Sequence, residues 1–171
     1  SEAPGGRDFR SKVIDPVRLG GEHVVWRNYE ASYDVAGLNP GSRDHSTYVL
    51  LEYFVPMDRF MDFAPAMAEI FERFDANVVN VSIRHANADP DTFLSWAPEA
   101  CFALVIYFKQ GTEPSAQTEV GVWTRALNEA VLASGGTYYL PYQLHATQDQ
   151  FHRAYPRARE FFQLKAELDP D

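Results

Sequence analysis

Hydrophobic residues gather in four short segments that have the pattern of β-strands. Each segment is rich in β-branched or aromatic side chains, which favour strands. The first segment is stopped by Pro56, and the third, a continuous apolar run, is followed by Lys109-Gln110-Gly111. A short continuous run of this kind indicates a central strand that is buried on both faces. The predicted strands are Thr47–Val55, Val78–Arg84, Cys101–Phe108 and Thr137–Leu140.

Helical spacing fills the interval between the first two strands. Apolar residues from Phe60 to Phe74 recur every three or four positions, as they do on one face of a helix. Asp58 stands where an N-cap is expected. Pro65 lies inside the pattern, so either the helix is kinked there or its regular part begins near Ala64.

Three further helical segments are predicted in the second half of the chain. One runs from Glu113 to the pair Gly135-Gly136, because glycine is a common helix stop. After the fourth strand, Thr147 is expected to cap a helical turn. Pro156 is expected at the start of a last helix, a place where proline is tolerated.

The resulting order is strand, helix, strand, strand, helix, strand. This is the split β-α-β order of ferredoxin-like α+β folds, in which helices cover one face of an antiparallel sheet. We assign residues 46–171 to this domain and residues 1–45 to an irregular N-terminal arm with a possible strand at His23–Tyr33. The second sheet face is expected to stay uncovered, and its aromatic strands favour contact with a ligand, a partner or a second copy.

Charge and cysteine content exclude several classes of protein. Acidic residues number 24 and basic residues 15, which gives a formal net charge of −9. Nucleic-acid binders and polybasic membrane anchors need a cationic surface, so neither class is expected. The single cysteine, Cys101, permits neither an internal disulfide nor a CxxC metal site. No apolar run has the length of a membrane span and no signal peptide is recognised, so we interpret the protein as cytoplasmic.

Recognised catalytic and binding motifs are missing from the sequence. The five histidines are far apart, without HExxH or a His/Cys cluster, which disfavours a metal site. The chain also lacks a P-loop, a GxGxxG turn and a GxSxG elbow. Cys101 opens an apolar strand and is interpreted as a small buried hydrophobe in preference to a nucleophile.

Polar residues within and after the strands are the remaining candidates for a site. Glu52 interrupts the first strand, Arg84 ends the second, and Tyr142 and His145 follow the fourth. Sites are commonly built at strand ends and in the loops that follow them. Side chains alternate along a strand, so Ser82 and Arg84 share a face. The residues alone leave open whether Glu52 and Arg84 face solvent, pair with each other or form a site.

The end of the chain resembles a known enzyme family. The segment GGTYYLPYQLHATQDQFHRAYPRAREFFQLKAELDPD combines Gly-Gly, a strand, a polar residue, a Thr-capped turn, Tyr-Pro, a helix and Asp-Pro. Two shorter blocks, EYFVP at Glu52–Pro56 and VNVSIR at Val79–Arg84, agree with it. The pattern is similar to that of FAD-linked oxidoreductases of the vanillyl-alcohol oxidase superfamily. Within it, the branch of sugar-1,4-lactone oxidases, alditol oxidase and decaprenylphosphoryl-ribose oxidase is the most similar, over about residues 48–171.

The resemblance implies a role for the whole chain. In that family an N-terminal domain binds FAD, and a C-terminal cap domain lays an antiparallel sheet over the flavin and forms the substrate pocket. This chain is then expected to be the cap domain, with the FAD-binding domain absent from it and the fragment alone inactive. Its partners would be the FAD-binding domain of the same polypeptide and a small-molecule substrate that gives up a hydride from a carbinol carbon.

The resemblance also implies roles for individual residues. Arg84 keeps the cation of a Glu-x-Arg pair in the alditol oxidase pocket, whereas Ser82 replaces its carboxylate. Tyr142 stands where relatives have a pocket lysine, and Tyr107 where they have polar pocket residues on the third strand. Arg84 and Tyr142 are therefore expected to act in catalysis. The expected substrate contacts are Glu52, Ser82, Tyr107 and His145.

A second interpretation belongs to another class of protein. The same order of elements occurs in free-standing ferredoxin-like modules that bind a partner or dimerise through the sheet without any catalysis. The two interpretations differ in what precedes this chain in its open reading frame. A flavin-binding domain there would support the enzyme, and its absence would support the binding module.

Overall fold

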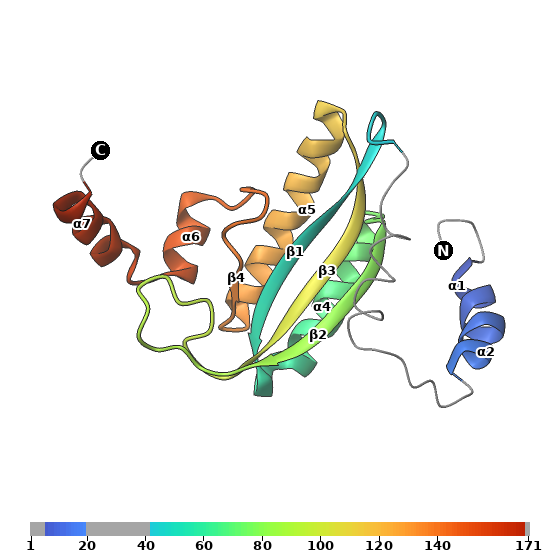
Figure 1. The fold of residues 1–171 in the computed structure, drawn as a ribbon, viewed down its shortest axis with the longest axis horizontal. Coiled ribbons are helices and arrows are strands. Elements are labelled where there is room, and N and C mark those ends of the chain that lie inside the picture. Colours follow the sequence, from blue (N-terminus) through green and yellow to red (C-terminus); the bar gives the residue numbers. More distant parts are fainter. Residues whose placement is uncertain (1–5, 20–41, 170–171) are drawn as a thin grey trace. The chain divides into compact units, whose positions relative to one another are not determined.

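The structure, a computed structural model, describes residues 6–19 and 42–169 (Figure 1). Contacts divide the chain into two units, residues 1–43 and 44–171. In the first unit, residues 6–19 form consecutive helical turns, so the prediction of an irregular arm is wrong for them. The turns are α1 (Gly6–Phe9), the π-helical η1 (Arg10–Ile14) and α2 (Asp15–Leu19). The strand predicted at His23–Tyr33 lies outside the described residues.

The second unit is α+β and is built on a four-stranded antiparallel sheet. Its strands are β1 (Ser46–Pro56), β2 (Val78–Ala86), β3 (Cys101–Gly111) and β4 (Thr137–Tyr138). They lie in the order β2-β3-β1-β4, as Figure 1 shows. All four predicted strands are confirmed, although β4 is shorter than predicted. The central pair, β1 and β3, stays in register from Ser46 opposite Gly111 to Pro56 opposite Cys101.

Two helices, α4 (Phe60–Arg73) and α5 (Pro114–Ala133), cover one face of this sheet. Side chains alternate along β1 and β3, so every second residue points toward the helices. These residues interlock with the apolar stripe of α5 and exclude water from the main core. Its most deeply buried side chains include Tyr53, Val55, Phe63, Leu104, Ile106, Phe108, Leu127 and Val131, none more than 1% exposed.

The start of α4 differs from the sequence prediction. A 3-10 turn, η2 (Met57–Arg59), precedes the helix, and the N-cap residue is Arg59, which makes no side-chain cap hydrogen bond. The prediction of Asp58 as N-cap is therefore wrong. The helix runs on through Pro65, which lies in its second turn and is exposed to solvent. Burial of the apolar face thus outweighs the backbone hydrogen bond that Pro65 lacks.

Two helices, α6 (Gln148–Ala154) and α7 (Ala158–Leu168), follow β4. Thr147 caps α6 as predicted. Its Oγ1 accepts the N–H of Gln150 at 3.2 Å, and Gln150 Oε1 accepts the N–H of Thr147 at 3.1 Å, which completes a capping box. The last helix begins at Ala158, two residues after Pro156, so that prediction is correct only in its approximate place.

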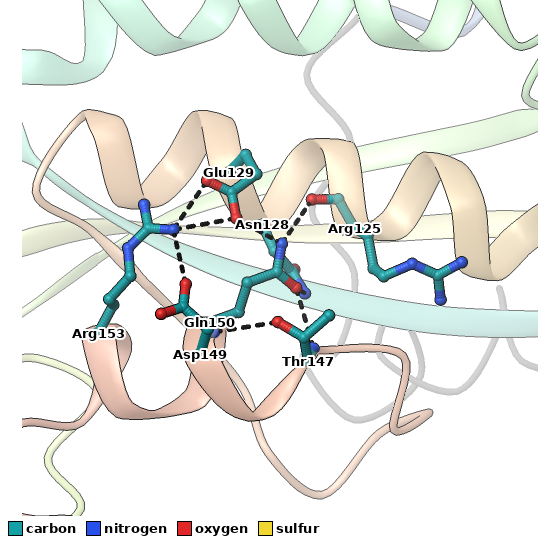
Figure 2. A network of polar contacts seen from close by, with 7 residues as sticks. All are labelled: Arg125, Asn128, Glu129, Thr147, Asp149, Gln150 and Arg153. Atoms are coloured by element: carbon teal, nitrogen blue, oxygen red, sulfur yellow. Dashed lines mark hydrogen bonds and ion pairs between the residues drawn. The ribbon is translucent and has the colours of Figure 1, made fainter.

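A polar network around Gln150 fixes α6 to α5 (Figure 2). Gln150 Nε2 donates to the carbonyl oxygen of Arg125 at 3.0 Å and to Glu129 Oε1 at 2.8 Å. Arg153 Nη1 is 2.9 Å from Glu129 Oε2 and 3.2 Å from Asp149 Oδ2. Gln150 is only 3% exposed, so the centre of the network is shielded from water while its ion pairs lie at the surface.

The loop between β2 and β3 covers one end of the second sheet face. Trp96 in this loop stacks on Phe54 with the ring centroids 4.3 Å apart, and its carbonyl oxygen accepts the hydroxyl of Thr137 at 2.5 Å. Together they bury a second, smaller core: Phe54, Ala97, Cys101 and Ala103. The prediction of an uncovered face is therefore wrong at this end, because the loop has apolar residues of its own. Cys101, 3% exposed, is the buried small residue that was expected.

Candidate functional site

Arg84 lies on the sheet face opposite α4 and α5. It pairs with Ala103, a member of the smaller core on that face, and its own side chain is exposed. Ser82, two residues earlier, pairs with Val105, and its Oγ accepts a hydrogen bond from Asn80 Nδ2 at 3.1 Å. The structure thus puts Arg84 and Ser82 on one face, as the alternation along the strand predicts.

Glu52 reaches the same face from β1. It pairs with Val105, which in turn pairs with Ser82 on β2, so one apolar residue separates the two polar positions. Partial burial raises the pKa of the Glu52 carboxyl above its ordinary value of 4.5, and the positive charge of Arg84 lowers it by less. Glu52 and Arg84 therefore interact electrostatically across β3.

Tyr142 extends this group from the segment that follows β4. Burial raises the pKa of its hydroxyl, the charge of Glu52 raises it further, and Arg84 acts in the opposite direction. Its ring meets that of Tyr139 edge-on, with the centroids 5.2 Å apart. Three of the residues predicted from the sequence, Glu52, Arg84 and Tyr142, therefore share one electrostatic environment.

Tyr107 lies on the same face but farther along β3. It pairs with Leu50 and Asn80, and its ring stacks on that of Tyr48 at a centroid distance of 5.1 Å. The two rings form an aromatic surface beside the charged group. Next to this aromatic surface lie a cation, a carboxyl group with a raised pKa and a phenol. This arrangement suits an apolar molecule with a hydroxyl group, because the carboxylate can accept the proton of that hydroxyl.

His145 is not part of this group. Its Nε2 is 2.9 Å from Gln143 Oε1, and its backbone oxygen accepts a hydrogen bond from Arg125 Nη1 at 3.4 Å. Gly121 of α5 makes room for the ring, since a Cβ there would lie 3.2 Å from Nδ1. Burial, with the charge of Arg125, lowers the pKa of His145. The structure thus places His145 against α5, apart from the residues with which the sequence analysis grouped it.

A cavity of about 230 Å³ lies between the β1–β4 edge of the sheet, α5, α6 and the connecting segment 139–147. Most of its lining is apolar and includes Leu51, Leu140 and Phe151, but Glu52 also belongs to it. Three residues of the lining carry a fully buried hydroxyl group that has no hydrogen-bond partner within the described part of the chain. These groups are Tyr53 Oη, Thr124 Oγ1 and Tyr138 Oη.

The strand β4, which borders the cavity, is short. It pairs with β1 at only two positions, and the N–H of Tyr139 makes one more hydrogen bond, to the carbonyl oxygen of Glu52 at 2.9 Å. Two residues later, Pro141 has no N–H with which to continue the ladder. The chain leaves the sheet there, so the prediction that the strand reaches Leu140 is wrong, and the segment that follows β4 lines the cavity.

Sequence reasoning missed this cavity. Tyr53 and Tyr138 lie in predicted strands and Thr124 in a predicted helix, and each adds one polar atom to an apolar stripe. A polar atom on an otherwise apolar stripe is the one feature of the sequence that could have indicated the cavity. That Tyr53 and Tyr138 are neighbours follows only from the pairing of their strands, which the pattern along the chain does not reveal.

No protein-family model matches the chain, and a search of curated proteins found no significant match. Within residues 6–19 and 42–169, no helix is both long and apolar enough to cross a membrane. The same residues contain no group of three or more His, Cys, Asp or Glu side chains placed to hold a metal ion.

Proposed function

We propose that residues 44–171 form the substrate-side cap domain of an FAD-dependent oxidoreductase that acts on a carbinol-type substrate. The observation that supports this most strongly is the group formed by Arg84, Glu52 and Tyr142 on the sheet face away from the helices. The strand order and the two covering helices agree with the ferredoxin-like arrangement that the sequence predicts. The resemblance of the C-terminal segment to this enzyme family supplies the reaction class.

Each residue of the group has a chemical task in this proposal. The guanidinium of Arg84 stabilises negative charge on the substrate oxygen as the carbon loses its hydride. Tyr142 donates a hydrogen bond to that oxygen and orients it. The carboxylate of Glu52 accepts the hydroxyl proton, so that the alcohol becomes a carbonyl compound. Partial burial raises the pKa of Glu52, which makes its carboxylate a stronger base.

The flavin fits this face as a neighbour that another domain binds. A flavin supplies the hydride acceptor, while the protein supplies position and charge. The sequence has no nucleotide-binding motif of its own. It does present a cation and a phenol donor on one open surface, groups that suit an electron-rich ring and an anionic substrate oxygen. The chain's own part is therefore to bind the substrate and hold its oxygen.

The test begins with the complete open reading frame. Its product is expected to be yellow and to reduce a dye in the presence of sugars, lactones or alcohols. A product that carries no flavin would overturn the proposal and leave the binding module as the alternative. In the flavin-bearing protein, Arg84→Ala should lower kcat about a hundredfold, a loss of about 3 kcal/mol, and change KM much less.

Two further variants sharpen this test. Tyr142→Phe should lower kcat about tenfold, because a neutral hydrogen bond contributes about 1 kcal/mol. Arg159→Ala is the matched control, since Arg159 is exposed on α7, away from the Arg84 face. Its kinetics should equal those of the wild type. An equal loss in Arg84→Ala and Arg159→Ala would show that net charge, and not the position of Arg84, sets the rate.

A further inference from the structure

We propose that the cavity between β1, β4, α5 and α6 holds the apolar body of the substrate, so that the substrate is a small alcohol built on a hydrocarbon ring or short chain and not a sugar or polyol. The inference rests on the proposed oxidoreductase function, because it names the substrate class of the group formed by Arg84, Glu52 and Tyr142. It assigns the hydroxyl group of the substrate to that group of residues and the hydrocarbon part to the cavity.

The cavity lies at the edge of β1 where the short β4 ends. Successive side chains of a strand point to opposite faces. The lining nevertheless includes the neighbours Leu51 and Glu52 of β1, and also Tyr138 and Tyr139. Leu51 and Tyr138 belong to the main core under the helices, whereas Tyr139 packs against Phe54 of the smaller core on the other face. Residues of both sheet faces therefore line one cavity at this edge.

Glu52 connects the cavity to the proposed catalytic group. It belongs to the lining, is only partly buried, and interacts with the charge of Arg84 and with the hydroxyl of Tyr142. Tyr142 itself stands between Leu140 and Gln143, two residues of the lining. A substrate that fills the cavity therefore lies against Glu52, the residue that accepts the proton of the hydroxyl group in the proposed reaction.

The walls of the cavity fit a hydrocarbon in kind and in size. Leu51, Leu140 and Phe151 are apolar, and no Lys, Arg or His of the described part of the chain belongs to the lining. An acidic substrate would therefore lose its hydration there without gaining a counter-charge. A dry cavity of about 150 Å³ can hold benzene, so this one, of about 230 Å³, has room for a ring with a hydroxymethyl group.

Three polar side chains of the lining already have partners within the protein. Gln143 Oε1 is 2.9 Å from His145 Nε2, and Thr147 Oγ1 accepts the N–H of Gln150. Asn128 Nδ2 donates to Gln150 Oε1 at 3.4 Å. A polyol in the cavity would thus leave hydroxyl groups without hydrogen bonds, which is a loss that a hydrocarbon body does not incur.

The hydroxyl groups of Tyr53, Thr124 and Tyr138 do not change this preference. All three are fully buried, so they are out of contact with a molecule in the cavity. The partly buried carboxyl of Glu52 is therefore the polar group that the substrate meets, and one hydroxyl group is enough to match it. A single hydroxyl on an apolar body is the pattern of an aromatic or short aliphatic alcohol.

Binding of two alcohols to the chain as it stands is the first test. Benzyl alcohol is a ring with a single hydroxyl, whereas xylitol carries a hydroxyl on every carbon. Benzyl alcohol should bind with a Kd of about 1 mM or lower, and xylitol about tenfold more weakly. In an NMR titration, benzyl alcohol should shift methyl signals of Leu140 and Ala146 in the lining and not those of Leu168, which is exposed on α7. Equal affinity for the two alcohols, or shifts only outside the lining, would overturn the inference.

Cavity variants separate this site from other binding surfaces. Ala146→Leu fills part of the cavity and should weaken benzyl alcohol binding about tenfold. Ala166→Leu is the matched control, because it makes the same change on the exposed surface of α7, and it should leave the affinity unchanged. Leu140→Ala keeps the inference falsifiable should Ala146→Leu not fold. It enlarges the cavity and should raise the affinity for 2-naphthalenemethanol relative to benzyl alcohol about tenfold. Unchanged affinities in the folded cavity variants would refute the site.

Turnover by the flavin-bearing product of the complete open reading frame is the second test. Its kcat/KM should be about tenfold higher for benzyl alcohol than for xylitol, and Ala146→Leu should raise KM for benzyl alcohol more than it lowers kcat. A yellow protein that oxidises xylitol in preference would overturn this inference and leave the proposed function standing. A colourless protein would overturn the proposed function, and with it this inference, before any alcohol is added.

Discussion

Replacing Gln150 with leucine would show how α6 is held on α5. The side chain makes four hydrogen bonds: Nε2 donates to Arg125 and Glu129, and Oε1 accepts from Thr147 N and, at 3.4 Å, from Asn128 Nδ2. Leucine has a similar size but leaves the Asn128 amide, 2% exposed, without this acceptor. A hydrogen bond contributes about 1 kcal/mol net, and a stranded buried donor costs about 1–3 kcal/mol. We expect a loss of about 3 kcal/mol in the free energy of unfolding.

Thermal unfolding followed by circular dichroism measures this loss. For a chain of this length, 1 kcal/mol corresponds to about 3 °C, so Gln150→Leu should melt about 9 °C below the wild type. Gln163→Leu is the matched control, because Gln163 is exposed on α7, and it should change stability by less than about 0.5 kcal/mol. If Gln150→Leu melts within about 2 °C of the wild type, apolar packing and not this network holds α6.

Three other features give predictions with short tests. Gly136→Ala should lower the free energy of unfolding by about 3 kcal/mol, since a Cβ there would overlap a backbone carbonyl oxygen. Gly135→Ala, where a Cβ has space but φ is 73°, should lower it by about 1 kcal/mol. The reverse order of the two variants in urea unfolding would contradict this. Cys101, whose pKa burial raises, should react with a disulfide reagent only after denaturation, and fast labelling of the native protein would show that it is accessible. Hydrogen bonds, chiefly from Gln150, hold the pKa of Glu129 in the folded protein below its ordinary value of 4.5. The ionised Glu129 carboxylate therefore stabilises the fold above pH 4.5, and this stabilisation is lost as the pH falls through the lowered pKa of the folded state. In Glu129→Gln the melting temperature should therefore depend less on pH in that acidic range, and an unchanged dependence would argue against the network.

The parts of the fold that follow from local patterns were predictable. The continuous run at Cys101–Phe108 indicated a central strand, and β3 does lie between β2 and β1. Thr147 capped a helix as expected, because a capping box depends on residues three apart. The cover that Trp96 places over Phe54 was not predictable, since it joins a loop to a strand about forty residues away.

The candidate site shows the same limit. Alternation placed Arg84 on the face away from the helices, because the period of a strand is fixed by its backbone. His145 follows β4 just as Tyr142 does, but Gly121 leaves room for its ring against α5. A loop has no periodicity that distinguishes these two directions, so the sequence alone could not predict that His145 packs against α5.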